Sequence, residues 1–185
     1  MIKREEALLF LKENLNEINL VKHSLACEAA MIALADHFQE DREKWGLSGL
    51  LHDIDYEQTK NNPEKHSLIG SQMILEYGFD SEIAQAVKTH NFSHGILPDT
   101  KMAKALYCLD SLTGLIVAAT LVLPEKKISL LNKENVLNRF KEKCFARGAR
   151  REEILKCEEL LELSLVDFID ITLKAMQGIS EELGL

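Results

Sequence analysis

The residues of this sequence best suited to chemistry are histidines and aspartates spread over its first 110 positions. His52 and Asp53 are adjacent and follow the apolar stretch 45–51, where a histidine beside an aspartate is a poor choice for packing. Neutral imidazole and carboxylate groups together form a mixed nitrogen and oxygen shell for a divalent metal. If the scattered members converge in space, they form a hydrolytic metal centre. The other members of this candidate set are His23, His66, His90 and Asp110.

Helices must position these residues, because apolar side chains recur at helical spacing and no stretch alternates as a strand does. Gly78 is a plausible helix C-cap, Asp80 or Ser81 can cap the next helix, and Gly95 and Pro98 mark 91–99 as a loop. The candidate ligands then fall on five successive helices, with His52 and Asp53 together near the end of the third, and facing helices commonly build metal sites. The predicted helices are 5–14, 21–38, 42–51, 66–77, 81–90, 102–123, 133–146, 150–163 and 165–183.

Length and composition predict one all-α domain over residues 1–185. Few prolines, glycines and aromatic residues favour helices over sheets. The net charge of −8 argues against binding of long nucleic acids, which need an electropositive surface. A small anionic phosphorylated compound can still bind where metal and a few cations gather in one pocket.

The chain is expected to be cytoplasmic and not to enter a membrane. Its first residues lack an apolar signal core, and the apolar run 112–123 is too short to span a bilayer. The four cysteines are widely separated and are interpreted as reduced, small core residues; they are Cys27, Cys108, Cys144 and Cys157.

The candidate set resembles the HD superfamily of metal-dependent phosphohydrolases. The superfamily pattern H…HD…D is filled by His23, His52-Asp53 and Asp110. The segment 49–55 (Gly-Leu-Leu-His-Asp-Ile-Asp) looks like the core signature. The segments 65–70, 86–90 and 104–110 resemble motifs of the subgroup with extra histidines. The resemblance covers roughly 20–120 and implies a helical HD-domain bundle, with additional C-terminal helices over about 125–185.

The resemblance also implies a ligand set. His23, His52, Asp53 and Asp110 would bind one metal, and Asp53 would bridge to a second metal held by His66 and His90. One or two divalent ions are expected, and these ligands accept Fe, Mn, Ni, Co or Zn. Asp55 replaces the glycine of the common HDIG variant and is free to orient a histidine by accepting its other N–H.

The expected activity is hydrolysis of a phosphomonoester or phosphodiester, such as a nucleotide or a similar metabolite. A divalent ion supplies an activated water at neutral pH. Asp53 is mainly a ligand and only secondarily a proton acceptor, whereas His90 or His94 can serve as general acid. His94 can equally be a solvent-exposed loop residue, and His37 is assigned to the surface.

A basic cluster surrounds residues 141–151 in an otherwise acidic chain. Lys143 and Arg147 are candidate substrate contacts, although cations near a helix end also complement its dipole. Two other functions stay open: a di-iron oxygenase on the same ligand scaffold, and a non-catalytic metal-binding regulatory module. The C-terminal helices can pack internally or form a homodimer.

Overall fold

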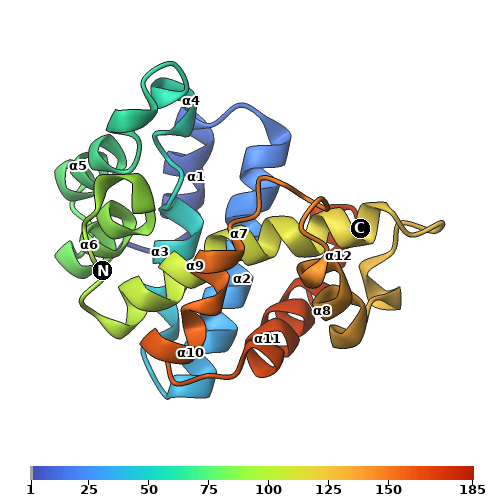
Figure 1. Cartoon of the computed structure of the whole chain (residues 1–185). Helices are drawn as coiled ribbons and strands as arrows, with labels where there is room; N and C mark the ends of the chain where they lie inside the picture. Colours follow the sequence, from blue (N-terminus) through green and yellow to red (C-terminus); the bar gives the residue numbers. More distant parts are fainter. Residues whose placement is uncertain (1) are drawn as a thin grey trace.

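Two long helices, α2 (Ile18–Phe38) and α7 (Lys101–Leu121), form the centre of the fold (Figure 1). The computed structural model describes residues 2–185, and every regular element within them is helical, as predicted. Both helices carry the apolar faces of the core, including Met31, Leu34, Leu106 and Leu112, which are fully buried. The remaining helices pack around this pair, so α2 and α7 bring His23 and Asp110 face to face.

Helix α3 (Arg42–Leu51) packs along α2 more extensively than any other pair of helices in the described chain. Asp41 caps α3, since its side chain accepts a hydrogen bond from the Lys44 amide. Gly49 permits the close approach, because a Cβ there would lie 2.6 Å from the carbonyl oxygen of Cys27. The close packing brings His52, at the C-terminal end of α3, next to His23.

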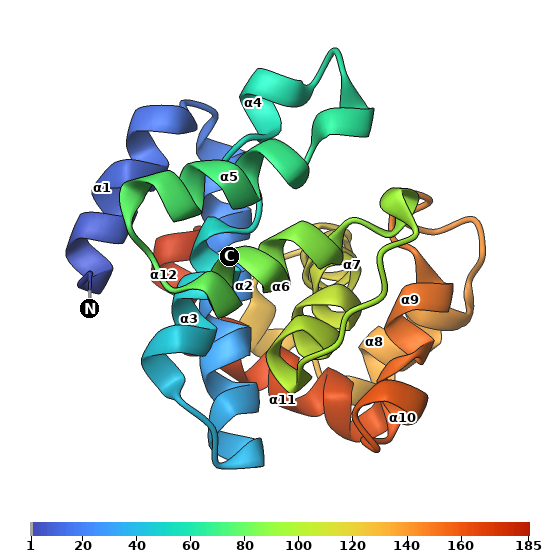
Figure 2. The ribbon, with the colours of Figure 1, turned by 90° about the vertical axis from the view of Figure 1, so that its left-hand side faces the viewer.

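Helices α5 (Leu68–Tyr77) and α6 (Ser81–His90) form a hairpin beside α3 and α7 (Figure 2). The predicted punctuation is confirmed. Gly78 ends α5 in a left-handed conformation, and Asp80 caps α6 by accepting from the Glu82 amide. The prediction that His66 opens the helix is wrong. His66 lies after the short turn η1 (Pro63–Lys65), and Ser67, with φ 69°, separates it from α5.

The N-terminal helix and the short turns complete this half of the bundle. Helix α1 (Arg4–Asn14) packs on α3. Helix α4 (Tyr56–Thr59) follows the candidate pair His52 and Asp53, and η2 (Phe92–His94) lies inside the predicted loop 91–99. Thr100 caps α7 by accepting from the Ala103 amide.

The residues after Pro124 form further helices that pack mainly on α7 and α2. Three expected bounds are wrong: 133–146 stops at Lys141, and 150–163 and 165–183 are each divided in two. Cys144 is exposed in the turn after α8, not in the core; Cys27, Cys108 and Cys157 are buried as expected. The elements are η3 (Ile128–Leu130), α8 (Lys133–Lys141), α9 (Arg151–Leu155), α10 (Cys157–Leu160), α11 (Leu165–Gln177) and α12 (Ser180–Leu183).

Helices α2 and α7 are long and apolar enough to cross a membrane by length and composition alone. Half of the apolar window of α2 and two thirds of that of α7 are buried inside the fold. Core helices of soluble proteins satisfy the same criterion, so this is weak evidence for a membrane span.

Candidate metal centre

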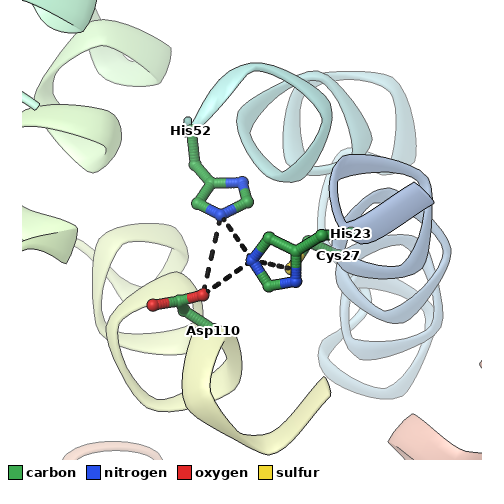
Figure 3. Close-up of side chains that lie close together, drawn as sticks. All are labelled: His23, Cys27, His52 and Asp110. Carbon is green, nitrogen blue, oxygen red and sulfur yellow. Dashed lines mark hydrogen bonds and ion pairs between the residues drawn. The ribbon is translucent and has the colours of Figure 1, made fainter. Parts of the chain in front are cut away.

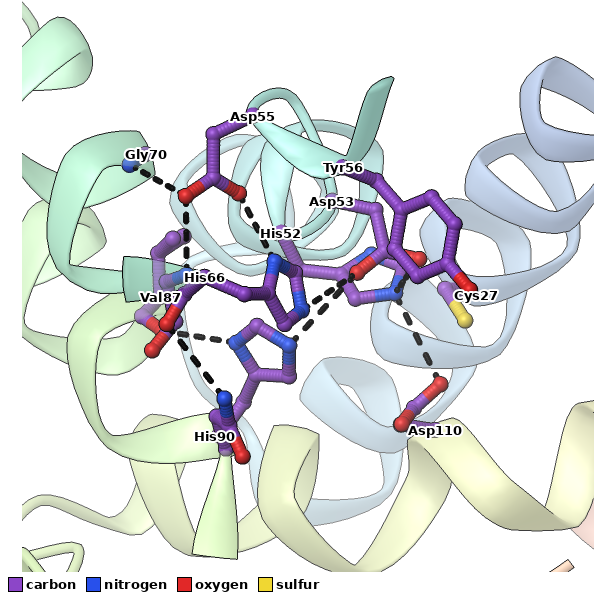
Figure 4. Close-up of polar contacts among 12 residues, drawn as sticks. Cys27, His52, Asp53, Asp55, Tyr56, His66, Gly70, Val87, His90 and Asp110 are labelled. Atoms are coloured by element: carbon purple, nitrogen blue, oxygen red, sulfur yellow. Dashed lines mark hydrogen bonds and ion pairs between the residues drawn. The ribbon is translucent and has the colours of Figure 1, made fainter. Parts of the chain in front are cut away.

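All six candidate ligands converge on one point of the bundle (Figures 3 and 4). They come from α2, the end of α3, the turn before α5, the last residue of α6, and the middle of α7. The imidazole rings of His52 and His90 are buried, and their centroids lie 5.1 Å apart. Residues far apart in the sequence therefore form one cluster, as their distribution over the helices predicted.

Hydrogen bonds at Nδ1 orient the histidine rings so that each Nε2 faces the centre. His52 Nδ1–H donates to the Gly49 carbonyl at 2.8 Å, and His90 Nδ1–H donates to the Val87 carbonyl at 2.6 Å. The Nδ1 of His23 lies 3.2 Å from the hydroxyl of Thr113. A partner on one ring nitrogen fixes the tautomer and leaves the lone pair of the other for a metal.

Asp53 presents a different carboxylate oxygen to each half of the cluster. Oδ1 lies 3.3 Å from His66 Nε2 and 3.6 Å from His90 Nε2. Oδ2 lies 3.4 Å from His52 Nε2 and 3.7 Å from His23 Nε2. A carboxylate held between two pairs of imidazole nitrogens suits the bridging position between two ions.

Asp110 and Cys27 lie on the side of His23 and His52 (Figure 3). Asp110 Oδ1 is 2.9 Å from His23 Nε2, and the Sγ of Cys27 is 3.9 Å from that nitrogen. The sequence predicts Cys27 only as a core residue. The available signal was its position four residues after His23, because residues i and i+4 share one face of a helix. His23, Cys27, His52 and Asp110 all lie close enough together to hold one ion.

The pKa values of the cluster reflect the clustering of opposite charges. Burial alone lowers the pKa of His66, but Asp53 and Asp55 together raise it to about 9. Burial also opposes ionisation of Asp53, yet the neighbouring histidines, with His52 first, hold its pKa well below the usual range. Without a metal the site is therefore occupied by protons on histidine. Metal binding displaces those protons and strengthens as the pH rises.

Asp55 orients His66 and is confirmed in the supporting role predicted for it (Figure 4). Its Oδ1 accepts from His66 Nδ1–H at 2.9 Å, and its Oδ2 accepts from the amides of Ser67 and Gly70 at 2.8 and 2.9 Å. Gly70 suits this contact, since a Cβ there would lie 3.1 Å from the carboxyl carbon and the carboxylate would have to shift. The buried carboxylate thus caps α5 and fixes the ring of His66.

Asp55→Asn is expected to weaken binding of the metal held by His66 by about 10- to 100-fold, the usual cost of losing such a partner. The amide keeps the size of the side chain but offers an N–H group where an acceptor is needed. Metal titration followed by calorimetry measures the change, with Asp99→Asn in an exposed loop as the control. Affinity equal to that of the control would contradict the role of Asp55.

The remaining candidate residues occupy different surroundings. His94 Nε2–H donates to the His66 carbonyl at 2.6 Å, so this ring anchors the loop after α6; its catalytic role stays a prediction. His37 is exposed, as expected. Lys143 and Arg147 are exposed on the turn between α8 and α9, and their contact with substrate also stays a prediction.

The site opens toward the C-terminal helices. A pocket of about 310 Å³ is lined by His23 and Asp110 on one side and by residues 146, 148 and 149 of the α8–α9 turn on the other. The side chains of His23 and Asp110 are 23% and 33% exposed, whereas His52 is fully buried. Arg151 shapes the turn by donating to main-chain carbonyls, among them those of Phe140 and Ala149. The C-terminal helices therefore supply one wall of the entrance.

A buried carboxyl group, Glu153, lies behind this wall. Burial raises its pKa to about 7, with the charge of Asp110 adding to the effect and Arg150 opposing it. The folded protein therefore holds this proton more tightly than the unfolded chain, whose glutamate has the usual pKa of 4.5. The stability cost of ionising Glu153 is absent below pH 4.5, develops as the pH rises toward 7, and is complete above it.

Glu153→Gln is expected to remove this pH-dependent loss in the metal-free protein. Between pH 5 and pH 8 the wild type should lose about 2 kcal/mol more unfolding free energy than the variant. Urea unfolding of both proteins at the two pH values measures the difference. Parallel losses in the two proteins would show that Glu153 ionises normally.

Comparison with known families agrees with this geometry. The model of the HD domain family matches residues 20–119, more than half of the chain. The chain belongs to the HD domain family. The matched segment contains all six candidate ligands, and the family places the protein in the superfamily of metal-dependent phosphohydrolases.

An uncharacterized protein of Methanocaldococcus jannaschii is 34% identical over 91 residues, which is 46% of this chain and 52% of that protein. The chain thus spans about half the length of the curated relative it matches. No solved structure matches the chain.

The donor set of this HD domain fits a divalent metal. Imidazole nitrogens and carboxylate oxygens are the ligand types that Mn, Fe, Co, Ni and Zn share. The His23 and His52 Nε2 atoms lie only 3.1 Å apart, an arrangement of two lone pairs that requires a proton or a cation between them. This HD domain therefore contains a cluster that can hold a metal.

Proposed function

We propose that this HD-domain protein is a metal-dependent phosphohydrolase with two ions in its site, acting on a small phosphorylated metabolite such as a nucleotide. The observation that carries the proposal is the division of the Asp53 carboxylate, with Oδ1 toward His66 and His90 and Oδ2 toward His23 and His52. When bound, divalent ions supply Lewis acidity and a water of lowered pKa.

The residues of the chain have separate tasks in this proposal. His23, His52 and Asp110 would hold one ion, His66 and His90 would hold the other, and Asp53 would serve as a ligand to both. Burial of His52 and His90 excludes water from the inner side, so the substrate approaches from the exposed side of His23 and Asp110. The adjoining pocket of about 310 Å³ is at the lower end of the size range of small-molecule sites.

A di-iron oxygenase is the second candidate, favoured by the same observation, because a carboxylate between two groups of histidines also suits a pair of iron ions. The two functions differ in their need for oxygen. Hydrolysis of a phosphoester uses water as its only co-substrate, whereas an oxygenase consumes O₂.

The test is a screen of the protein reconstituted separately with Mn²⁺ and Fe²⁺, with and without oxygen. Nucleoside monophosphates, sugar phosphates and a chromogenic phosphodiester form the panel, and phosphate or alcohol release is measured. The expected result is metal-dependent, oxygen-independent hydrolysis of at least one class. Oxygen uptake by the iron form without hydrolysis would overturn the proposal in favour of the oxygenase. A metal-loaded protein inert in both assays would favour the non-catalytic module.

A further inference from the structure

The arginines of the chain divide into two groups by what their guanidinium groups contact. Four are committed to partners within the fold. The committed pairs are Arg4 with Glu28, Arg42 with Asp36, Arg139 with Glu142, and Arg151 with main-chain carbonyls of the α8–α9 turn. Arg147 and Arg150 form no such hydrogen bonds within residues 2–185, so their donors can serve a ligand.

Arg150 differs from Arg147 because its guanidinium is held in place. Its central carbon lies 3.3 Å from the centroid of the Phe92 ring, a cation–π stack. Its Nη1 lies 3.6 Å from Glu153, which is an ion-pair distance but too long for a hydrogen bond. The stack therefore holds the guanidinium in place, and apart from the ion pair with Glu153 its N–H groups have no partner within residues 2–185.

Residues on either side of Phe92 in the sequence are hydrogen-bonded to the main chain of the candidate ligand His66. Asn91 Nδ2 donates to the His66 carbonyl at 3.3 Å, and His94 donates to the same oxygen. The Phe92 ring is 40% exposed, and it carries Arg150 on its face. Ala149, which directly precedes Arg150 in the sequence, lines the pocket that contains His23 and Asp110. Figure 2 shows the loop after α6 beside the segment that leads into α9.

We propose that Arg150, stacked on Phe92, binds the phosphoryl group of the substrate at the mouth of the metal centre. The inference rests on the proposed phosphohydrolase function and names a residue of its substrate site. A guanidinium can donate two parallel N–H bonds to phosphate oxygens, and a preorganised one loses less entropy on binding than a mobile one. Arg150 combines these donors with a fixed position on Phe92, two residues after the candidate ligand His90, whereas Lys143 and Arg147 are cations on an exposed turn without such a stack.

The test is calorimetric titration of the manganese-loaded protein with inorganic phosphate. Arg150→Ala is expected to weaken phosphate binding about 10-fold, in the range of a lost charge-assisted hydrogen bond. Arg150→Lys should recover part of the affinity, because the charge remains but the paired donors do not. Phe92→Leu should weaken binding in the same direction by a smaller factor, since the arginine loses its platform. In turnover assays, Arg150→Ala should raise KM more than it lowers kcat.

Arg42→Ala is the matched control, because it removes an equal charge from the exposed ion pair with Asp36 at the start of α3, outside the candidate substrate site. It should bind phosphate within about twofold of the wild type. Metal content and thermal midpoints establish that each variant is folded; Arg150 is half-exposed, so its truncation should leave both unchanged. Phosphate affinity unaffected by Arg150→Ala, equal losses in both alanine variants, or no phosphate binding by the wild type would each overturn the inference.

The two proposals fail separately. Phosphate binding that depends on Arg150, with no ester hydrolysed, would retain the anion site and remove the phosphohydrolase function. Ester hydrolysis combined with phosphate binding that does not depend on Arg150 would retain the phosphohydrolase function and remove the anion site.

Discussion

Asp53→Asn should lower phosphate release by about a thousandfold or more and reduce the bound metal below two ions per chain. The carboxylate lies between two groups of imidazole nitrogens, with each oxygen 3.3 to 3.7 Å from a pair of them. An amide has one carbonyl oxygen and a neutral charge, so it cannot serve both sides. Lewis-acid stabilisation is worth several kcal/mol in the transition state, and each 1.36 kcal/mol is tenfold in rate.

Elemental analysis of the reconstituted variant and steady-state assays measure the two effects together. Asp36→Asn is the control, since Asp36 forms an exposed ion pair with Arg42 on the surface. Helical circular dichroism should be the same in both variants. Wild-type turnover by Asp53→Asn would refute the bridging role. Loss of activity with two ions still bound would show that Asp53 is needed for catalysis but not for metal binding.

The largest effect on stability is expected for Gly49→Ala. A Cβ at this position would lie 2.6 Å from the Cys27 oxygen, 2.7 Å from its carbonyl carbon and 2.9 Å from the Glu28 nitrogen. These are main-chain atoms of α2, which cannot rotate away, so α3 must shift from α2. Overpacking of this kind costs about 3 kcal/mol, equivalent to a fall of roughly 10 °C in the melting temperature of a chain this size.

Gly114→Ala provides the matched control, because it also lies inside a helix but has no heavy atom within 4 Å of the added Cβ. It should raise stability by about 1 kcal/mol, the usual gain of alanine over glycine in a helix. Thermal unfolding of both metal-free variants gives the comparison. Equal melting temperatures would contradict the close packing of α2 and α3. Gly49→Ala should also weaken metal binding, since the Gly49 carbonyl orients the ring of His52.

The sequence predicted the all-α fold because helices depend on regular spacing. Periodicity also placed His23 and Asp110 on separate helices and His52 near the end of a third, whereas the resemblance to the HD superfamily implied that these residues share one ion. Asp55 was predicted to orient a histidine from its residue type and its place beside the pair, and its contact with His66 confirms it.

The parts that sequence reasoning missed depend on tertiary contacts. The turn at Ser67 is held in a left-handed conformation by a carboxylate twelve residues away, which no local propensity encodes. Helix α8 ends at Lys141 because Arg151 occupies the carbonyls that follow, and the same turn exposes Cys144. The stack of Arg150 on Phe92 joins residues 58 positions apart in the sequence, so spacing alone could not separate it from the other cations of the cluster.

The contacts of Asp55 also connect the metal centre to the local opening of α5. One carboxylate fixes the ring of His66 and satisfies the first amides of the helix, so unfolding of this segment would release both together. Opening of this segment would weaken the binding of an ion held through His66. By thermodynamic linkage, the bound ion must stabilise the start of α5 by the same free energy. Amide hydrogen exchange at Gly70 should therefore slow as the site fills, giving a readout of metal occupancy that needs neither substrate nor turnover.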